Sequence, residues 1–254
     1  MKYLFVALLI LASNAFSKST ADLSGDIKIY SQELGYYIQY RVFLPPDYSN
    51  DESLPVIYVT DGHEYINKGK MHNLLNRLIK SNKIEPLIAV FIDPRDPDNL
   101  TKSRRSSELF CNHQYVKFIS SELVQSVDSN YKTATTPNKR VILGLSDGGL
   151  NSVCTGVLAP DIFEGVGMMS AQLRTLPEIF TIFQKSKKLP LNFYLTAGSG
   201  IYDTRKQTRE FFMILEEKGY SAKIKLTNKK HDWRNWKSVL DDVLIYFFGV
   251  VHEK

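Results

Sequence analysis

The sequence has only two cysteines among its 254 residues, so a disulfide-dense scaffold is excluded. After its N-terminal segment it has no apolar run long enough to cross a membrane. It also has no phosphate-binding glycine loop, and no spacing of His, Cys, Asp and Glu typical of a metal site. A net charge of +5 is too small to indicate a nucleic-acid partner. We therefore expect chemistry without a cofactor or a metal, and no nucleic acid.

The first 17 residues have the pattern of a signal peptide. Met1-Lys2 is a short basic start, an apolar run follows from residue 3 to residue 12, and Ala15-Phe16-Ser17 is typical of a signal-peptidase site. A buried N-terminal strand is the alternative. We expect a periplasmic or secreted protein with one domain over residues 18–254, and no stable membrane insertion once the signal is removed. An exported protein could pair Cys111 with Cys154, but we expect two small buried thiols.

Along the rest of the chain, short apolar runs alternate with segments whose apolar residues recur at helical spacing. The alternating segments 26–31 and 36–44 predict a β-hairpin. We expect further strands at 54–60, 87–92, 141–143, 165–169, 192–196 and 222–226, and helices at 70–80, 115–127, 175–185, 205–218 and 233–248. This order predicts an α/β fold, with a mostly parallel, doubly wound sheet led by an antiparallel hairpin and helices on both faces. The polar segment 93–112 is expected to be a surface excursion near the strand ends.

Residues 140–149, Arg-Val-Ile-Leu-Gly-Leu-Ser-Asp-Gly-Gly, contain a G-x-S-x-G pentapeptide between a strand and the start of a helix. A serine on such a sharp turn has strained backbone angles, and side chains at Gly144 and Gly148 would collide with neighbouring chain. The turn would lift Ser146 Oγ clear of the sheet and place it at a helix N-terminus, which favours a developing oxyanion. Ser146 is therefore the candidate nucleophile. The alternative is a glycine-rich turn that happens to contain a serine.

In a sheet of this kind, functional residues gather at the carboxyl ends of the strands. Ser146, Asp203 and His231 each follow a predicted strand, in the chain order Ser, acid, His that the α/β-hydrolase topology requires. His231 would take the serine proton, and Asp203 would fix the imidazole tautomer and stabilise the imidazolium. Asp232 and Glu210 are rival acids. Asp232 adjoins the histidine and would point elsewhere, whereas Glu210 lies well inside a helix.

Two backbone N–H groups are candidates for an oxyanion hole. The residue after the nucleophile typically supplies one, so we assign the N–H of Asp147. The second should come from the loop after the strand at 54–60, where Gly62 and His63 both offer N–H groups. We favour His63.

With these residues in view, the chain resembles the esterase family of α/β-hydrolases that includes enterochelin (enterobactin), feruloyl and acetylxylan esterases and esterase D-like enzymes. The resemblance covers nearly all of the chain after residue 17. It rests on residues 40–48 (Tyr-Arg-Val-Phe-Leu-Pro-Pro-Asp-Tyr), Asp61-Gly62, the pentapeptide, and His231-Asp-Trp233 with Trp236. Residues 105–112, Arg-Ser-Ser-Glu-Leu-Phe-Cys-Asn, resemble the enterochelin esterase branch most. Two lysines stand before His231, where this family usually has a glycine.

The resemblance adds candidate substrate-binding residues. For an anionic ester, cationic contacts would come from Arg104 and Arg105, with Lys102 and Arg174 nearby, and aromatic contacts from Tyr65 or Trp233. Glu108 is included with them, although it could pair with Arg105 in a structural role. The alternative for the basic residues is a solvated loop.

We therefore expect an exported serine esterase acting on a small-molecule or glycan-linked ester. One candidate substrate is an enterobactin-like siderophore. The alternatives are acetyl or feruloyl groups on polysaccharide, acyl transfer to a sugar, and a catalytically silent hydrolase-fold binding protein.

Overall fold

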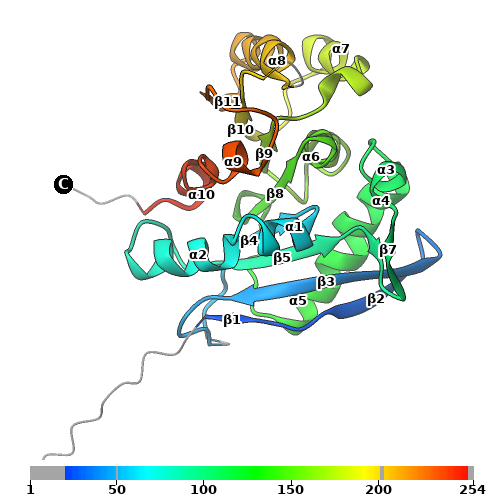
Figure 1. The fold of residues 1–254 in the computed structure, drawn as a ribbon, viewed down its shortest axis with the longest axis vertical. Coiled ribbons are helices and arrows are strands. Elements are labelled where there is room, and N and C mark those ends of the chain that lie inside the picture. Colours follow the sequence, from blue (N-terminus) through cyan, green and yellow to red (C-terminus); the bar gives the residue numbers. More distant parts are fainter. Residues whose placement is uncertain (1–20, 50, 201–202, 251–254) are drawn as a thin grey trace, which may run out of the picture.

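The computed structural model describes residues 21–49, 51–200 and 203–250. The expected signal peptide lies outside these ranges. Figure 1 shows a twisted sheet with helices on both sides. The strands of this sheet are β1 (Asp22–Leu23), β2 (Ile27–Ser31), β3 (Tyr36–Leu44), β4 (Val56–Val59), β5 (Ile88–Asp93), β8 (Arg140–Leu145), β9 (Gly165–Met169), β10 (Asn192–Ala197) and β11 (Ser221–Leu226).

The order of the strands is β1-β3-β5-β4-β8-β9-β10-β11, with β2 paired to β3. All pairs from β5 to β11 are parallel, whereas β1, β2 and β5 each pair antiparallel with β3. Gly35, at φ 76°, makes the turn between β2 and β3, a conformation that glycine adopts without strain. The predicted parallel sheet with an antiparallel N-terminal hairpin is confirmed.

Alternation along the strands divides the core into two apolar clusters. Tyr58 and Ile142 belong to the cluster on one face, and their neighbours Ile57 and Leu143 to the cluster on the other. Because successive side chains of a strand point to opposite faces, each central strand feeds both clusters and is buried throughout. The first face is covered by α4 (His113–Lys117), α5 (Val124–Asn130), α6 (Asp147–Leu158), α7 (Glu178–Lys185) and α8 (Arg205–Glu217), and the second by α1 (Gly62–Asn67), α2 (Met71–Lys80), α9 (Trp233–Trp236) and α10 (Leu240–Phe248).

Several elements differ from the sequence-based expectation. Helix α1 follows β4 after only two intervening residues, at a place where a loop was expected. The last helix is interrupted between α9 and α10, and the helix expected at 115–127 contains a π-helical stretch at Phe118–Leu123. The polar excursion contains a small hairpin, β6 (Arg95–Asp96) with β7 (Asn99–Ser103), followed by the short helix α3 (Arg105–Glu108).

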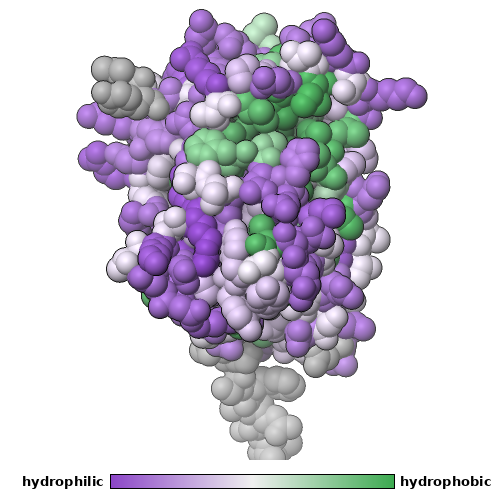
Figure 2. Space-filling view, turned by 90° about the vertical axis from the view of Figure 1, so that its right-hand side faces the viewer, coloured by the Kyte–Doolittle hydropathy of each residue, from purple (hydrophilic) through white to green (hydrophobic). Residues whose placement is uncertain are grey.

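The two cysteines are joined, which contradicts the expectation of free thiols. Cys111 and Cys154 form a disulfide with Cα atoms 5.5 Å apart, which ties the segment after α3 to helix α6. Beside the disulfide lies an apolar pocket of about 240 Å³ whose lining includes Phe110, Leu158 and Ile182, each more than a third exposed. Figure 2 shows a broad apolar area on this side of the molecule. Within the three described ranges, no helix is both long and apolar enough to span a bilayer.

Candidate active site

Ser146 is the single residue between strand β8 and helix α6. Its backbone angles are φ 55° and ψ −117°, a conformation that costs free energy in a residue with a side chain. The N–H of Ser146 donates to the carbonyl of Met169 on β9 at 2.8 Å, which holds the turn against the next strand. A Cβ built on Gly144 would lie 2.1 Å from the carbonyl oxygen of Gly148, and one on Gly148 would lie 2.5 Å from Thr60 Oγ1. Both glycines of the pentapeptide are therefore sterically required.

His231 lies beside this serine. It follows β11 and precedes α9, and its Nε2 is 3.0 Å from Ser146 Oγ, a hydrogen-bond distance. The imidazole and the ring of Trp236 pack in a T-shaped arrangement, with centroids 5.0 Å apart and planes at 84°. This packing fixes the ring while leaving its side chain 18% exposed. The pair has the geometry needed for proton transfer from the hydroxyl to the imidazole.

Asp203 completes the set predicted from chain order, at a greater distance. Its Oδ1 is 3.9 Å from His231 Nδ1, within ion-pair range but too long for a hydrogen bond. The carboxylate is fully buried and accepts from the Thr204 N–H at 2.6 Å and from Asn235 Nδ2 at 3.5 Å. Burial alone would raise the pKa of Asp203, but His231 and the backbone N–H groups of Thr204 and Gly198 outweigh it and lower the pKa. Asp203 is therefore held as a carboxylate.

Neither rival acid faces the histidine. The carboxylate of Asp232 caps α9 by accepting from the N–H groups of Arg234 and Asn235, and it pairs with the Arg234 guanidinium at 2.8 Å. Glu210 is on α8 with its side chain 52% exposed, 3.9 Å from Lys206 Nζ.

The two segments predicted to carry oxyanion donors touch each other. Asp147 is the first residue of α6, and His63 is the second residue of α1. N–H groups in the first turn of a helix have no partner within the helix, so both can donate elsewhere. Besides lying close to Thr60, a Cβ on Gly148 would be 3.3 Å from Asp61 Oδ2, which shows how closely the start of α6 meets the end of β4.

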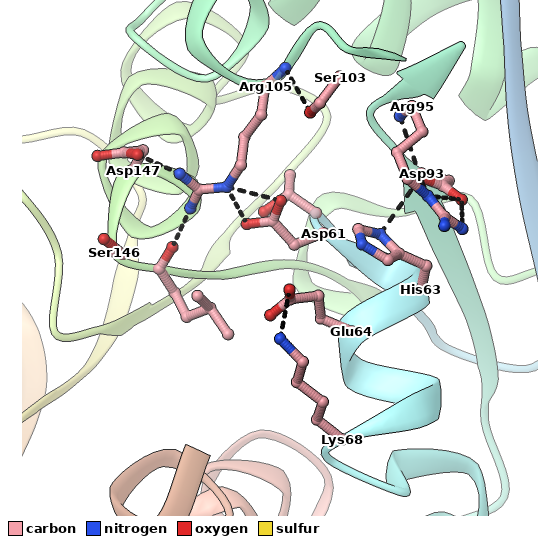
Figure 3. Close-up of polar contacts among 12 residues, drawn as sticks. Asp61, His63, Glu64, Lys68, Asp93, Arg95, Ser103, Arg105, Ser146 and Asp147 are labelled. Carbon is pink, nitrogen blue, oxygen red and sulfur yellow. Dashed lines mark hydrogen bonds and ion pairs between the residues drawn. The ribbon is translucent and has the colours of Figure 1, made fainter. Parts of the chain in front are cut away.

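The side chain of His63 has a separate environment. Its Nδ1 is 3.2 Å from Asp93 Oδ1, and Figure 3 shows the ring directed toward Asp93 and Arg95. Burial opposes ionisation of Asp93, but contacts from His63 and Arg95 hold its pKa well below the ordinary value. Only the backbone of His63 is thus a candidate for the oxyanion hole.

The predicted substrate-binding arginines are already paired. Arg105 contacts the carboxylates of Asp61 and Asp147, as Figure 3 shows. Arg104 pairs with Asp96 at 2.8 Å, and its guanidinium lies 4.3 Å from the ring centroid of Tyr36. Lys102 and Arg174 are exposed.

Glu108 does not pair with Arg105, which corrects that expectation. It is fully buried and accepts from Tyr36 Oη at 3.1 Å. Burial raises the pKa of Glu108 to about 8. A carboxyl group in this position is not placed to meet a ligand at the surface.

The two aromatic candidates are also separated by the structure. Tyr65 is fully buried, with its hydroxyl 3.4 Å from Met169 Sδ, so the prediction that it contacts substrate is wrong. Trp233 is partly exposed; its Nε1 donates to Glu64 Oε2 at 2.8 Å and its ring meets Trp236 edge-on. Trp233 remains a candidate for substrate contact.

Sequence reasoning missed two residues that organise the site. Asn235 is fully buried and links Asp203 to Thr227, whose Oγ1 donates to Asn235 Oδ1 at 2.6 Å. Its spacing of four residues from His231 is the only signal that could have indicated it. Asp61, which the sequence offers only as part of the Asp61-Gly62 pair, has a buried carboxylate that is bound to Arg105. Among the described residues, no group of three or more His, Cys, Asp or Glu side chains is arranged to hold a metal ion.

The chain matches a family model and several known proteins. A family model described as "Putative esterase" matches residues 31–209. The uncharacterized protein YjcH of Bacillus subtilis (strain 168) is 25% identical over 230 residues, covering 85% of this chain and 94% of the relative. An endo-1,4-beta-xylanase/feruloyl esterase of Xylanibacter ruminicola is 23% identical over 228 residues, which are 85% of this chain but only 30% of that protein.

Solved structures give the same fold. A ferulic acid esterase superposes with a TM-score of 0.78 at 19% identity, covering 90% of this chain and 98% of that one. The ferric enterobactin esterase of Salmonella typhimurium superposes with a TM-score of 0.78 at 20% identity, and here the match covers 90% of this chain but 58% of the other. Because the esterase model matches well over half of the sequence, the chain belongs to this esterase family, and its fold is that of the α/β-hydrolase esterases.

Proposed function

We propose that the protein is a serine esterase that cleaves a carboxylic ester through an acyl-enzyme, with Ser146 as nucleophile and His231 as general base. The observation that carries the proposal is the 3.0 Å contact between Ser146 Oγ and His231 Nε2 on a strained strand-to-helix turn. Family membership and the two esterase folds support the reaction type.

In the first half-reaction, Ser146 Oγ bonds to the ester carbonyl carbon while its proton passes to His231 Nε2. The carbonyl oxygen takes the negative charge, and the N–H groups of Asp147 and His63 donate to it. The bond from carbon to the alcohol oxygen then breaks, and the alcohol leaves with the proton from His231. Water repeats the sequence on the acyl-enzyme and releases the carboxylic acid. A sugar hydroxyl in place of water would give acyl transfer instead.

Asp203 stabilises the His231 imidazolium that forms in each half-reaction. Its depressed pKa keeps it charged, so it favours the protonated histidine electrostatically. At 3.9 Å it approaches the ring without a hydrogen bond, and catalytic contacts of this kind often shorten when substrate binds.

Two substrate classes follow from the relatives. The enterobactin esterase of Shigella flexneri was crystallised in the presence of enterobactin, which supports a catecholate siderophore as the ester. The pairing of Arg104 and Arg105 with carboxylates favours the second class, an uncharged feruloyl or acetyl ester, because neither guanidinium is free for an anionic ligand. The ferulic acid esterase, matched over 98% of its length, supports the same class.

We also propose that the protein acts outside the cytoplasm. The N-terminal sequence has the pattern of an export signal, and a structural disulfide is typical of the periplasm or the extracellular space.

The mechanism is tested by measuring hydrolysis of p-nitrophenyl acetate and butyrate with the protein expressed from residue 18 onward. Ser146→Ala and His231→Ala should each lower kcat by several orders of magnitude, whereas the exposed Ser121→Ala should match the wild type. A fluorophosphonate should label the wild type and not Ser146→Ala. Labelling or turnover that survives Ser146→Ala would reject the assignment. Methyl ferulate, acetylated xylan and enterobactin then separate the substrate classes.

A further inference from the structure

Arg105 is bonded to both segments that carry the proposed oxyanion donors. Its Nε donates to Oδ1 and Oδ2 of Asp61 at 2.9 and 3.0 Å. Its Nη1 donates to Asp147 Oδ2, and its Nη2 lies 3.4 Å from the carbonyl oxygen of Leu145. All three guanidinium nitrogens are therefore engaged, and Figure 3 shows the side chain lying between Asp61 and the turn that bears Ser146.

The two carboxylates bound by Arg105 belong to residues at or beside the proposed oxyanion donors. Asp61 is the N-cap of α1 with φ 55°, and the N–H groups of Gly62 and His63 follow it directly. Asp147 is the first residue of α6 and carries the other candidate N–H group itself. Arg105 thus bonds to the residue beside one donor and to the residue that supplies the other. A planar guanidinium holds such a bridge in a fixed geometry, which a lysine ammonium cannot do.

The charges around Arg105 do not fit an arginine that binds an anionic ligand. One guanidinium is shared by two carboxylates, so an anionic substrate approaching Arg105 would also meet Asp61 and Asp147. The Asp61 side chain is only 2% exposed, and its ionised form depends on its partner because a buried unpaired charge is costly. The Arg105 side chain is itself 30% exposed, so it lies between the buried Asp61 carboxylate and the solvent.

We propose that Arg105 is a positioning residue that sets the separation of the two oxyanion N–H groups by clamping Asp61 to Asp147, and that it does not bind the substrate. This inference rests on the proposed esterase function. A displacement of donors by even a fraction of an ångström weakens transition-state stabilisation, so loss of the clamp reduces kcat and leaves KM nearly unchanged.

The experiment compares Arg105→Gln, Arg105→Lys, Asp147→Asn and the double variant Arg105→Gln/Asp147→Asn on two esters. These are neutral p-nitrophenyl butyrate and anionic p-nitrophenyl hemisuccinate. We expect Arg105→Gln to lower kcat by about 100-fold on both esters with KM changed less than about twofold. Arg105→Lys and Asp147→Asn should each lose about 10-fold, and the double variant should be no worse than Arg105→Gln, because both changes break one bridge. Lys117→Gln, which removes a surface ion pair with Glu33, is the matched control.

A substrate-binding arginine gives the opposite pattern. Arg105→Gln would then raise KM for the anionic ester alone, and Asp147→Asn would lower that KM by freeing the guanidinium; either result overturns the inference. The rate of fluorophosphonate labelling separates this failure from failure of the proposed function. An unlabelled wild type overturns both, whereas a labelled wild type matched in rate by Arg105→Gln overturns the clamp alone. If Arg105→Gln does not fold, as judged by thermal unfolding, Arg105→Lys and Asp147→Asn decide the question.

Discussion

The carboxylate of Asp203 lies 3.9 Å from Nδ1 of His231, so the acid of this site is close to the histidine without being hydrogen-bonded to it. The opposite side of the ring has the tighter contact, 3.0 Å to Ser146 Oγ. We expect Asp203→Asn to lower kcat by about 10- to 100-fold, much less than Ser146→Ala or His231→Ala, because the longer contact orients the ring weakly. Steady-state kinetics on p-nitrophenyl butyrate gives the kcat of each of the three variants. A loss in Asp203→Asn equal to that in His231→Ala would mean that the contact shortens fully in the reacting complex.

We expect the buried carboxyl of Glu108 to make stability fall as pH rises. Its folded pKa is about 8, raised from 4.5 by burial, so between these values the unfolded chain releases a proton that the folded protein keeps. The free energy that Glu108 contributes to folding should therefore fall by up to about 5 kcal/mol from pH 4.5 to pH 8, and no further above that range. Glu108→Gln keeps an acceptor for Tyr36 and removes the titration. We expect its stability relative to the wild type to be greater at pH 8 than at pH 5, measured by urea unfolding at both values. An unchanged difference would show that Glu108 ionises normally.

Gly144, the first glycine of the G-x-S-x-G pentapeptide, should tolerate no side chain. Its Cβ would lie 2.1 Å from a backbone oxygen in the first turn of α6, and backbone cannot move aside as a flexible side chain can. We expect Gly144→Ala to lose most of its esterase activity and several degrees in Tm. Gly25→Ala is the matched control, because a Cβ there meets nothing within 4 Å and its φ is not in the left-handed region. Equal Tm and activity in the two variants would contradict the proposed steric role.

The disulfide should contribute to stability more than to catalysis at 25 °C. Cys111 and Cys154 are 43 residues apart, and closing a loop of that length stabilises a fold by up to about 4 kcal/mol. We expect Cys111→Ser/Cys154→Ser, or reduction of the wild type, to lower the midpoint of urea unfolding. Alkylation and mass spectrometry before and after reduction check the bond itself. Incorporation of two alkyl groups without reduction would show that the thiols are free.

Local sequence pattern was enough to predict the sheet and the strand-to-helix turn that bears Ser146. The central strands are continuous apolar runs buried on both faces, and the glycines at 144 and 148 have a steric reason that a single sequence displays. The chain order of Ser146, Asp203 and His231 also placed three residues that the fold brings to one edge of the sheet.

The missed features depend on contacts distant in sequence. Helix α1 is only six residues long and its N-cap Asp61 makes no side-chain cap, because that carboxylate is bound to Arg105 instead. Pairing of the two cysteines depends on how α6 packs beside the segment after α3, which no local pattern reports. For the same reason Arg105 looked like a free cation in the sequence, although two carboxylates from other elements surround it.

Strand β11 forms one border of the sheet, and its exposed side chains, all on one face of the strand, are those of Ser221, Lys223 and Lys225, the last 3.5 Å from Asp242. An open border can recruit a strand from another molecule, but two copies of β11 approaching each other would bring lysine against lysine. Self-association by sheet extension is thus discouraged by charge. Replacing both lysines with threonine should leave the fold intact and make the protein prone to aggregate at high concentration, which light scattering would detect.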